Sequence, residues 1–299
     1  MNILGISFLE DASACVLKDG RLIAALAQER LNRKKLWFGV PHEAIREVLK
    51  LTNTHIDEID FIATHGKCTR PDRVPFDQKI ELIIQSQLDE RGKQEQIEAV
   101  EKRYQHEVQV CTERTPTYLS ELDRYNKPIV TYGHHEAHAA SAIYGWGEKN
   151  CYLLTADGWG EDGSSTLWKV ENGLMKKLSF SHPFDSLGYF YGSVTKSLGF
   201  IPHRHEGKVL GLAAFCRNPK SYDGIRAMID FDRENMRFLG KMENGLYRPH
   251  FDNPRLDQFV KSYSREDVAS AAQISLEEVV CARQVFRANN LSDHLKRLF

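Results

Sequence analysis

The sequence predicts an α/β protein built from two similar lobes. Residues 2–28 and 151–180 share one plan, in which a buried strand, an acidic turn, a second strand, a short hairpin turn and a third strand follow one another. A repeat at about 150 residues is too long for a solenoid and suits a duplicated lobe. With 299 residues, the chain is long enough for two domains with a core each. Two unrelated antiparallel meanders would also share this plan, so both interpretations stay open.

The first half alternates short apolar runs with amphipathic segments. Lys18-Asp19-Gly20 predicts a tight hairpin between the second and third strands. Pro41 begins a predicted helix that runs to about residue 50 and has Ala44, Ile45 and Val48 on its apolar face. The further predicted elements are strands at 2–8, 11–18, 21–28, 61–64 and 128–132, a charged peripheral helix at 79–107, and a helix at 134–145.

The second half repeats the meander and then becomes helical. We expect strands at 151–156, 164–170 and 174–179, a Gly-rich turn at 158–163, helices at 186–198, 207–214 and 265–291, and an irregular polar segment at 217–262. The predicted lobes are therefore 1–149 and 150–299, with 217–262 as an insertion in the second. Two strands follow the meander in the first lobe and none follow it in the second. The second lobe is thus expected to be truncated, either because the chain is part of a longer protein or because another chain supplies the missing strands.

Composition excludes several classes of protein. Forty basic and forty-one acidic residues leave almost no net charge, which argues against electrostatic binding of DNA or a membrane across the surface. The six cysteines are scattered and form no CxxC pair, which favours a reducing, cytoplasmic setting over a disulfide framework. No signal peptide and no apolar run of about eighteen residues is present, so a cytosolic protein is expected.

The tightest constellation of chemically active residues lies around His134. His134 and His138 stand four apart in an Ala-rich, helix-favouring run, so both imidazoles project from one face. Asp157 ends an apolar run and enters a Gly-rich turn. Two imidazoles and a carboxylate form a plausible ligand set for a transition metal, although packed or exposed surface histidines would give the same spacing. The zinc-protease helix is excluded because Glu136 and His138 are one residue too close for His-Glu-x-x-His.

Two turns are suited to phosphate oxygens. The turns at 8–13 and 158–165 follow buried strands and are small or acidic, so their backbone N–H groups can approach an anion. Facing each other across a cleft, they would hold a nucleotide through Asp11, Ser13, Gly158 and Gly160. Asp11 and Asp157 could then bind a cation or orient a water. Each turn taken alone could be a simple hairpin.

Two cationic segments could add to an anion site. Residues 28–39 contain four basic residues in six positions, which form either a solvated loop or a wall for an anionic substrate. Gly207 and Lys208 stand near a predicted helix start, another place suited to anions, although the spacing is not that of a P-loop.

Several segments together resemble one family. In this order they are similar to the N-terminal domain of the O-carbamoyltransferases of antibiotic tailoring and nodulation-factor modification, which is related to the tRNA threonylcarbamoyl-transfer proteins. The segments are ILGIS (3–7), DASA (11–14), QERLNRKK (28–35), GVP (39–41), GHHEAHAASA (133–142), ADGWGE (156–161), DSLGYFY (185–191) and EGKVLGLA (206–213). The resemblance covers nearly the whole chain and implies the fold of the sugar-kinase, actin and heat-shock ATPase superfamily, with duplicated β-β-β-α-β-α lobes.

The resemblance also implies a reaction in two steps. A separate C-terminal domain makes carbamoyl adenylate from carbamoyl phosphate and ATP with magnesium, and this domain transfers the carbamoyl group to a hydroxyl of a small-molecule acceptor. By motif, His134, His138 and Asp157 match ligands of Fe(II) or a similar divalent metal. Lys35 matches a basic residue that contacts the carbamoyl adenylate and would offset charge on the departing AMP.

Two departures from the family pattern limit these expectations. Glu10 stands before Asp11 where the family usually has histidine, so it either replaces that histidine as a base or marks a changed substrate. The family's remaining metal ligand, a later aspartate, is not reached by Phe299. We therefore expect weak metal binding and no complete reaction from this chain alone.

Two other classes of function remain open for this sequence beside the transferase. The first is a non-catalytic, nucleotide-binding regulatory module that pairs with another chain, for example as a homodimer through an exposed strand edge. The second, a sugar-kinase-type phosphotransferase, is disfavoured by the His pair and by the missing second nucleotide site.

Overall fold

A computed structural model describes residues 1–8, 11–66, 71–160 and 163–298. The chain divides into two compact units, and each contains two stretches of sequence. Unit 1 comprises Met1–Arg70 and Glu107–His138, and unit 2 comprises Pro71–His106 and Ala139–Phe299. The two units are described separately.

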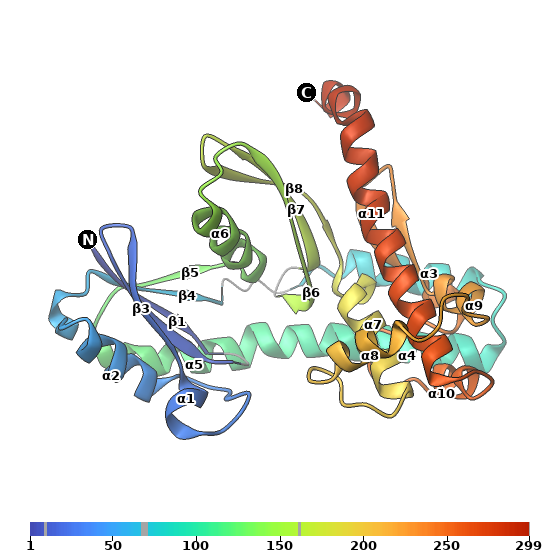
Figure 1. The fold of residues 1–299 in the computed structure, drawn as a ribbon, viewed down its shortest axis with the longest axis horizontal. Coiled ribbons are helices and arrows are strands. Elements are labelled where there is room, and N and C mark those ends of the chain that lie inside the picture. Colours follow the sequence, from blue (N-terminus) through green and yellow to red (C-terminus); the bar gives the residue numbers. More distant parts are fainter. Residues whose placement is uncertain (9–10, 67–70, 161–162, 299) are drawn as a thin grey trace. The chain divides into compact units, whose positions relative to one another are not determined.

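Unit 1 contains a five-stranded mixed sheet in the order β3-β2-β1-β4-β5 (Figure 1). Strands β1 and β2 and strands β2 and β3 pair antiparallel, whereas β4 is parallel to both β1 and β5. The elements of this unit are β1 Asn2–Ser7, β2 Ser13–Lys18, β3 Arg21–Ala27, α1 Gln28–Asn32, α2 His42–Leu51, η1 Ile56–Glu58, β4 Phe61–His65, η2 Val110–Arg114, α5 Thr115–Leu122, η3 Asp123–Tyr125, β5 Ile129–Tyr132 and the start of α6 His134–Trp146.

One face of this sheet carries the core of unit 1. Leu4, Ile6 and Val16 alternate with less buried neighbours, as the two-residue period of a strand requires. Helix α2 adds Ala44 and Ile45 to the same cluster, and Figure 1 shows α2 and α5 beside the sheet. Each fully buried aliphatic side chain contributes roughly 1.5–3 kcal/mol. The predicted helix with its apolar face is therefore confirmed.

The hairpin turns of the two meanders have the same geometry. Asp19 and Gly20 have φ angles of 50° and 75°, and Asn172 and Gly173 have φ angles of 53° and 79°. Two successive positive φ angles define the type I′ turn, whose twist matches that of the flanking strands. Asn, Asp and Gly tolerate this region of backbone space better than other residues do, so these dipeptides fix the two turns.

Unit 2 begins its sheet with the same plan as unit 1. Strands β6 Cys151–Gly160, β7 Gly163–Glu171 and β8 Leu174–Ser181 form an antiparallel sheet in the order β6-β7-β8. A short turn η4 Pro183–Asp185 and the helix α7 Leu187–Ser197 follow. Together with the β-β-β-α-β-α order of unit 1, this topology confirms the predicted α/β fold of the actin-like ATPase type.

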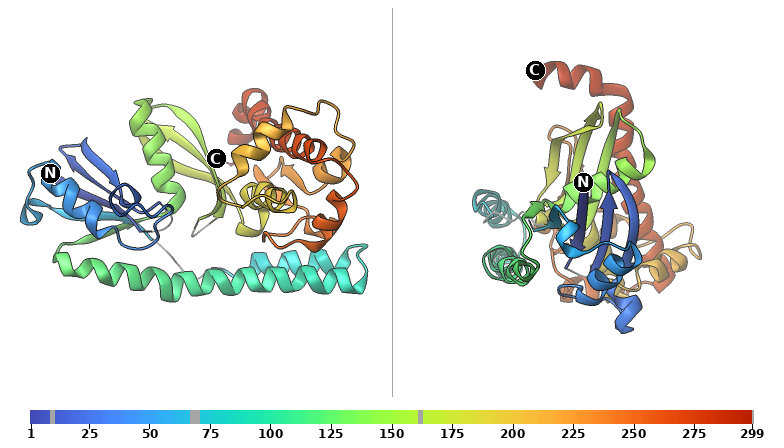
Figure 2. Two further views of the ribbon diagram at one scale, coloured as in Figure 1. Left: turned by 60° about the horizontal axis from the view of Figure 1, so that its bottom comes forward. Right: turned by 90° about the vertical axis from the view of Figure 1, so that its left-hand side faces the viewer.

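The charged segment 79–107 differs from its prediction. It contains two helices, α3 Val74–Gln85 and α4 Glu90–Gln109, which lie side by side (Figure 2). The rings of Phe76 and Tyr104 lie 5.1 Å apart between them. The segment is not peripheral, since it buries Lys79, Gln96 and Arg103. A pattern of hydrophobic residues could not reveal this, because these polar side chains are buried against partners distant in sequence.

The segment 217–262 is more regular than expected. It holds α9 Tyr222–Arg226, β9 Ile229–Asp232, β10 Arg237–Gly240, η5 Met242–Asn244 and α10 Pro254–Val260, preceded by α8 Glu206–Ala213 and followed by α11 Arg265–Leu298. The side chain of Asn253 accepts a hydrogen bond from Leu256 N and so begins α10. These elements are four to seven residues long, or three for the 3₁₀ turn, which is too short for hydrophobic periodicity to identify them.

Two expectations from composition meet different outcomes. No helix among the described residues is long and apolar enough to span a membrane. Cys111 forms a disulfide bond, which the scattered spacing of the cysteines did not predict. Sequence spacing does not reveal which cysteines fold close together.

A buried ion pair connects three elements of unit 2. Lys79 Nζ of α3 lies 3.1 Å from Asp185 Oδ1 and donates to Gly240 O at 2.9 Å. Gly240 N donates to the same Asp185 oxygen at 2.8 Å. The side chains of Lys79 and Asp185 are 7% and 2% exposed, so neither charge is solvated by bulk water. The pair therefore holds α3, η4 and β10 together.

Replacing Lys79 by methionine is expected to destabilise the protein by about 3–5 kcal/mol, because the Asp185 carboxylate stays buried without its cation. The measurement is the free energy of unfolding in urea. Lys50→Met is the control: its exposed pair with Glu47 predicts a loss below about 1 kcal/mol. Equal losses in the two variants would contradict a structural role for the buried pair.

Candidate functional site

The parallel strands of unit 1 bring a group of aromatic and imidazole rings to one edge of the sheet. The carboxyl ends of β1, β4 and β5 meet there, which is the edge where open α/β sheets bind ligands. Phe8 N donates to His65 Nε2 at 3.3 Å, and the two rings lie 4.3 Å apart. The His65 ring lies 6.4 Å from that of His134. Sequence analysis missed His65, and its only signal was a histidine at the end of a short strand.

The two predicted imidazoles are adjacent in the structure. His134 and His138 lie one turn apart on α6, with Nε2 atoms 3.1 Å from each other. The predicted common face of the helix is therefore observed. Glu136 instead accepts a hydrogen bond from Gly133 N at 3.2 Å and caps the helix start. Two imidazole nitrogens directed at one point suit a transition metal such as iron, zinc or copper.

Lys35 is held by a residue that sequence analysis did not select. Its Nζ lies 2.7 Å from Glu29 Oε1, and Leu36 N donates to the other carboxylate oxygen at 3.3 Å. These two hydrogen bonds, that from Lys35 first, hold the pKa of Glu29 below its usual range. The Lys35 side chain is 70% exposed, so its ammonium is both positioned and accessible.

The backbone of Phe8 joins the basic loop to the histidines. Its carbonyl accepts from Gly39 N at 2.9 Å, while its N–H donates to His65. Ala12 N donates to Trp37 O at 3.1 Å in the same region. The loop that carries Lys35 is thus fixed through Phe8 to the edge that carries His134.

The predicted residues of the first turn have mixed outcomes. Glu10 lies outside the described residues. Asp11 is exposed and has a φ angle of 59°, the left-handed region that Asp tolerates. Ser13 begins β2 opposite Ser7. A nucleotide-binding role for Asp11 and Ser13 stays a prediction.

Asp157 lies within strand β6 rather than at its end. The register with β7 shifts between Ala156 and Gly160, so Asp157 and Gly158 occupy an irregular stretch of the strand. This corrects the expectation of a simple Gly-rich turn at 158–163. The glycines there lie in a bulge of a strand whose pairing with β7 resumes at Gly160. A Gly-rich sequence does not distinguish a strand bulge from a turn.

The start of α7 packs directly on this bulge. Ser186 Oγ donates to Gly158 O at 2.6 Å and lies 3.2 Å from Asp157 O, and it accepts from Tyr189 N at 3.0 Å. A Cβ added to Gly188 would lie 2.6 Å from Gly158 Cα. The helix start therefore fixes the backbone that carries Asp157.

Gly207 and Lys208 lie in the first turn of α8 and are exposed. Lys208 Nζ lies 3.0 Å from His205 Nε2, one turn back. Their proposed contact with an anion stays a prediction.

Comparisons with known proteins agree with this description. The sequence profile of the family described as "Carbamoyltransferase N-terminus" matches residues 2–297. The nodulation protein NolNO of Sinorhizobium fredii is 27% identical over 307 residues, which cover 98% of this chain and 40% of that protein. An uncharacterized protein of Synechocystis is 28% identical over 298 residues, which cover 93% of this chain and 47% of that protein. The chain thus spans less than half the length of these two curated relatives.

One solved structure with a similar course of the chain is component A of the (R)-2-hydroxyglutaryl-CoA dehydratase of Acidaminococcus fermentans. It aligns with a TM-score of 0.49 and 13% identity, over 94% of this chain and 77% of that one.

Replacing Gly188 by alanine is expected to displace the Asp157–Gly158 backbone and to destabilise the protein by about 1–3 kcal/mol, because the new methyl group overlaps backbone atoms. Gly145→Ala in α6 is the matched control, since nothing lies within 4 Å of its added Cβ. That variant should gain roughly 0.5–1 kcal/mol through helix propensity. Thermal unfolding of both variants tests the difference, and a Gly188 variant as stable as wild type would contradict the close packing.

Proposed function

The chain belongs to the carbamoyltransferase N-terminus family, and from that premise we propose that it transfers a carbamoyl group from carbamoyl adenylate to a hydroxyl of a small-molecule acceptor. The observation that carries the proposal is the Phe8 backbone, which fixes the Lys35 loop and the His65–His134 edge to each other in unit 1. A cation-bearing loop and a pair of metal-type ligands on one edge suit a reaction in which negative charge moves onto a phosphate.

We further propose that His134, His138 and Asp157 hold Fe(II) or a similar divalent metal. The residues fit such an ion, because the two Nε2 atoms lie 3.1 Å apart and both can bind the same ion. When bound, the ion would supply Lewis-acid polarisation of a carbamoyl or phosphate oxygen. Asp157 is included because of the family motif, and its fixed backbone in unit 2 suits a ligand.

Lys35 would bind and orient the adenylate. Its ammonium is held by Glu29 and stays exposed, so it can contact a phosphate without a rearrangement of the loop. A positive charge placed there stabilises the AMP leaving group more than the mixed anhydride, since charge on the phosphate increases as the carbamoyl group departs. Glu10 or a water would then take the proton of the acceptor hydroxyl.

The first half-reaction is assigned to a part of the protein beyond this chain. The chain covers 47% and 40% of its two relatives. We propose that a part corresponding to the remaining length of these relatives makes carbamoyl adenylate from carbamoyl phosphate and ATP with magnesium. The present chain would then accept the carbamoyl adenylate.

The metal assignment is tested on the purified chain. His138→Ala should lose cobalt(II) binding in a titration followed by absorbance, and should change the free energy of unfolding by less than about 0.5 kcal/mol because the imidazole is exposed. His55→Ala, an exposed histidine elsewhere in unit 1, is the control and should bind as wild type does. Undiminished cobalt binding by the His138 variant would refute the assignment.

The role of Lys35 is tested in a protein that also carries the adenylate-forming part. Lys35→Ala should slow carbamoyl transfer about 100-fold and leave carbamoyl-adenylate formation unchanged, because only the leaving group loses its cation. Lys34→Ala is the neighbouring control. It removes the same charge, but the Lys34 ammonium lies over the Trp37 ring, 5.4 Å from its centroid, and is not the one paired with Glu29. Equal loss of both half-reactions would remove the separate role in transfer. Nucleotide binding without any turnover would instead favour the regulatory module.

A further inference from the structure

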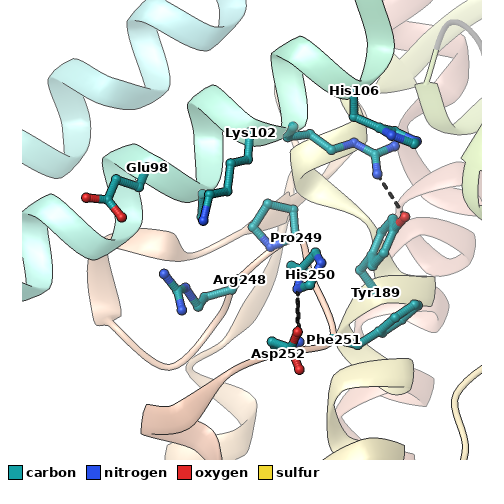
Figure 3. Close-up of a pocket in the computed structure, with 11 residues that line it drawn as sticks. Glu98, Lys102, His106, Tyr189, Arg248, Pro249, His250, Phe251 and Asp252 are labelled. Carbon is teal, nitrogen blue, oxygen red and sulfur yellow. Dashed lines mark hydrogen bonds and ion pairs between the residues drawn. The ribbon is translucent and has the colours of Figure 1, made fainter. Parts of the chain in front are cut away.

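Unit 2 contains a pocket that none of the predicted site residues line. Its volume is about 460 Å³, within the range of roughly 300–1,000 Å³ that is usual for small-molecule sites. The walls are α4, the start of α7 and the segment 248–252 (Figure 3). The lining residues are Glu98, Ala99, Lys102, Arg103, His106, Tyr189, Arg248, Pro249, His250, Phe251 and Asp252.

Arg103 is a buried cation in the wall of the pocket. Its side chain is 6% exposed, and Nη1 donates to the Tyr189 hydroxyl at 2.8 Å. The guanidinium lies 5.0 Å from the Trp159 ring centroid and 4.9 Å from that of Tyr189. Cation–π contacts and a hydrogen bond hold this charge in one orientation, as a binding site requires.

Two further cations line the same space. The Lys102 side chain is exposed and forms no hydrogen bond or ion pair with the described residues. Arg248 is half-buried, and its Nη2 donates to Glu95 O at 2.6 Å. Burial lowers the pKa of Arg248 and outweighs the attraction of the Glu95 and Glu98 carboxylates, so this charge has been partly removed from water.

The lining also contains two carboxylates, those of Glu98 and Asp252. Asp252 forms an ion pair with Lys196, which lies outside the lining. Glu98 accepts a hydrogen bond from Gln94 on the exposed face of α4. The lining therefore holds three permanent cations and two carboxylates, of which Asp252 is paired with Lys196.

His250 reports the resulting positive potential. Its pKa is lowered by partial burial and then by Lys196, Arg248, Lys102 and Arg103. Four cations thus act on His250, and the Asp252 carboxylate lies 3.8 Å from its Nδ1 on the other side of the balance. The larger number of cations favours an anion in the pocket.

The opposite wall is aromatic and rigid. The rings of Tyr189 and Phe251 lie 4.9 Å apart with an interplanar angle of 34°. A Cβ on Gly192 would lie 2.5 Å from the Phe251 ring, so this ring packs directly on α7. Ser193 Oγ donates to His250 O at 2.9 Å and fixes the loop. The wall presents a preformed apolar surface to a planar group.

We propose that this pocket binds a small phosphate monoester that carries a planar ring, with the phosphate against Arg248 and Lys102 and the ring against Phe251 and Tyr189. Guanidinium groups match phosphate oxygens in pairs, and an ammonium adds a compact charge. The pocket is lined only by residues of unit 2, and the proposal does not rest on the transferase assignment.

The test compares two probes with the same ring. 4-Methylumbelliferyl phosphate should bind the wild-type chain at least about tenfold more tightly than 4-methylumbelliferone, because only the ester carries the dianion. Its affinity should fall as salt rises from low to physiological concentration, as expected for a charge-driven complex. Fluorescence titration measures both.

Matched variants locate the site. Arg248→Gln should weaken the ester about tenfold or more, and Phe251→Leu should weaken both probes. Arg91→Gln removes an equal charge from α4 outside the pocket, where the side chain is 85% exposed, and should bind as wild type does. Lys102→Gln, which changes an exposed side chain, gives a second test if Arg248→Gln fails to fold.

Four outcomes would overturn the proposal. They are no binding of the ester by wild type, equal affinity for ester and phenol, equal losses in the Arg248 and Arg91 variants, and full displacement of the ester by inorganic phosphate at the same concentration. The last result would show an anion site without recognition of the ring.

Discussion

The buried pair of Lys79 and Asp185 is the constraint on which unit 2 depends. Two charges removed from water must be compensated by each other and by backbone groups, and here Gly240 supplies both a donor and an acceptor. Asp185 is followed directly by Ser186, whose hydroxyl holds the backbone of Asp157 and Gly158. A polar contact in the core is thus directly adjacent in sequence to the residue that holds the strand bulge at Asp157. The position of that aspartate is a consequence of core structure rather than of its own loop.

Local elements could be predicted from the sequence where a short-range physical rule fixes them. Asp19-Gly20 permits a left-handed turn that few other residues tolerate, and the apolar spacing around Ile45 fits only a helix. The prediction of a peripheral helix at 79–107 was wrong for a reason that lies far along the chain. Lys79 and Arg103 are buried because residues more than 80 positions away complete their hydrogen bonds. A charged helical pattern predicts an exposed helix unless those distant partners are known.

The candidate site shows the same division. The pairing of His134 and His138 follows from a spacing of four on a helix, so it could be predicted. His65 and Glu29 could not, because His65 reaches the edge through parallel strand pairing and Glu29 is selected only by the fold of the following loop. Asp157 could be selected by motif. The bulge in which it lies could not be predicted, because it depends on a shift of strand register that no single residue indicates. Motifs identify chemistry, whereas partners at long range position it.

Two aromatic residues of unit 2, Trp159 and Tyr189, lie between the pocket and the strand bulge at Asp157. Trp159 follows Asp157 by two residues on β6, and its ring lies 5.0 Å from the Arg103 guanidinium and 5.4 Å from the His106 ring. Tyr189 contacts Arg103 by its hydroxyl and Ser186 by its N–H. The residues that hold Arg103 in the pocket wall therefore also contact the strand that carries Asp157, through Trp159, and the helix start that holds it, through Ser186.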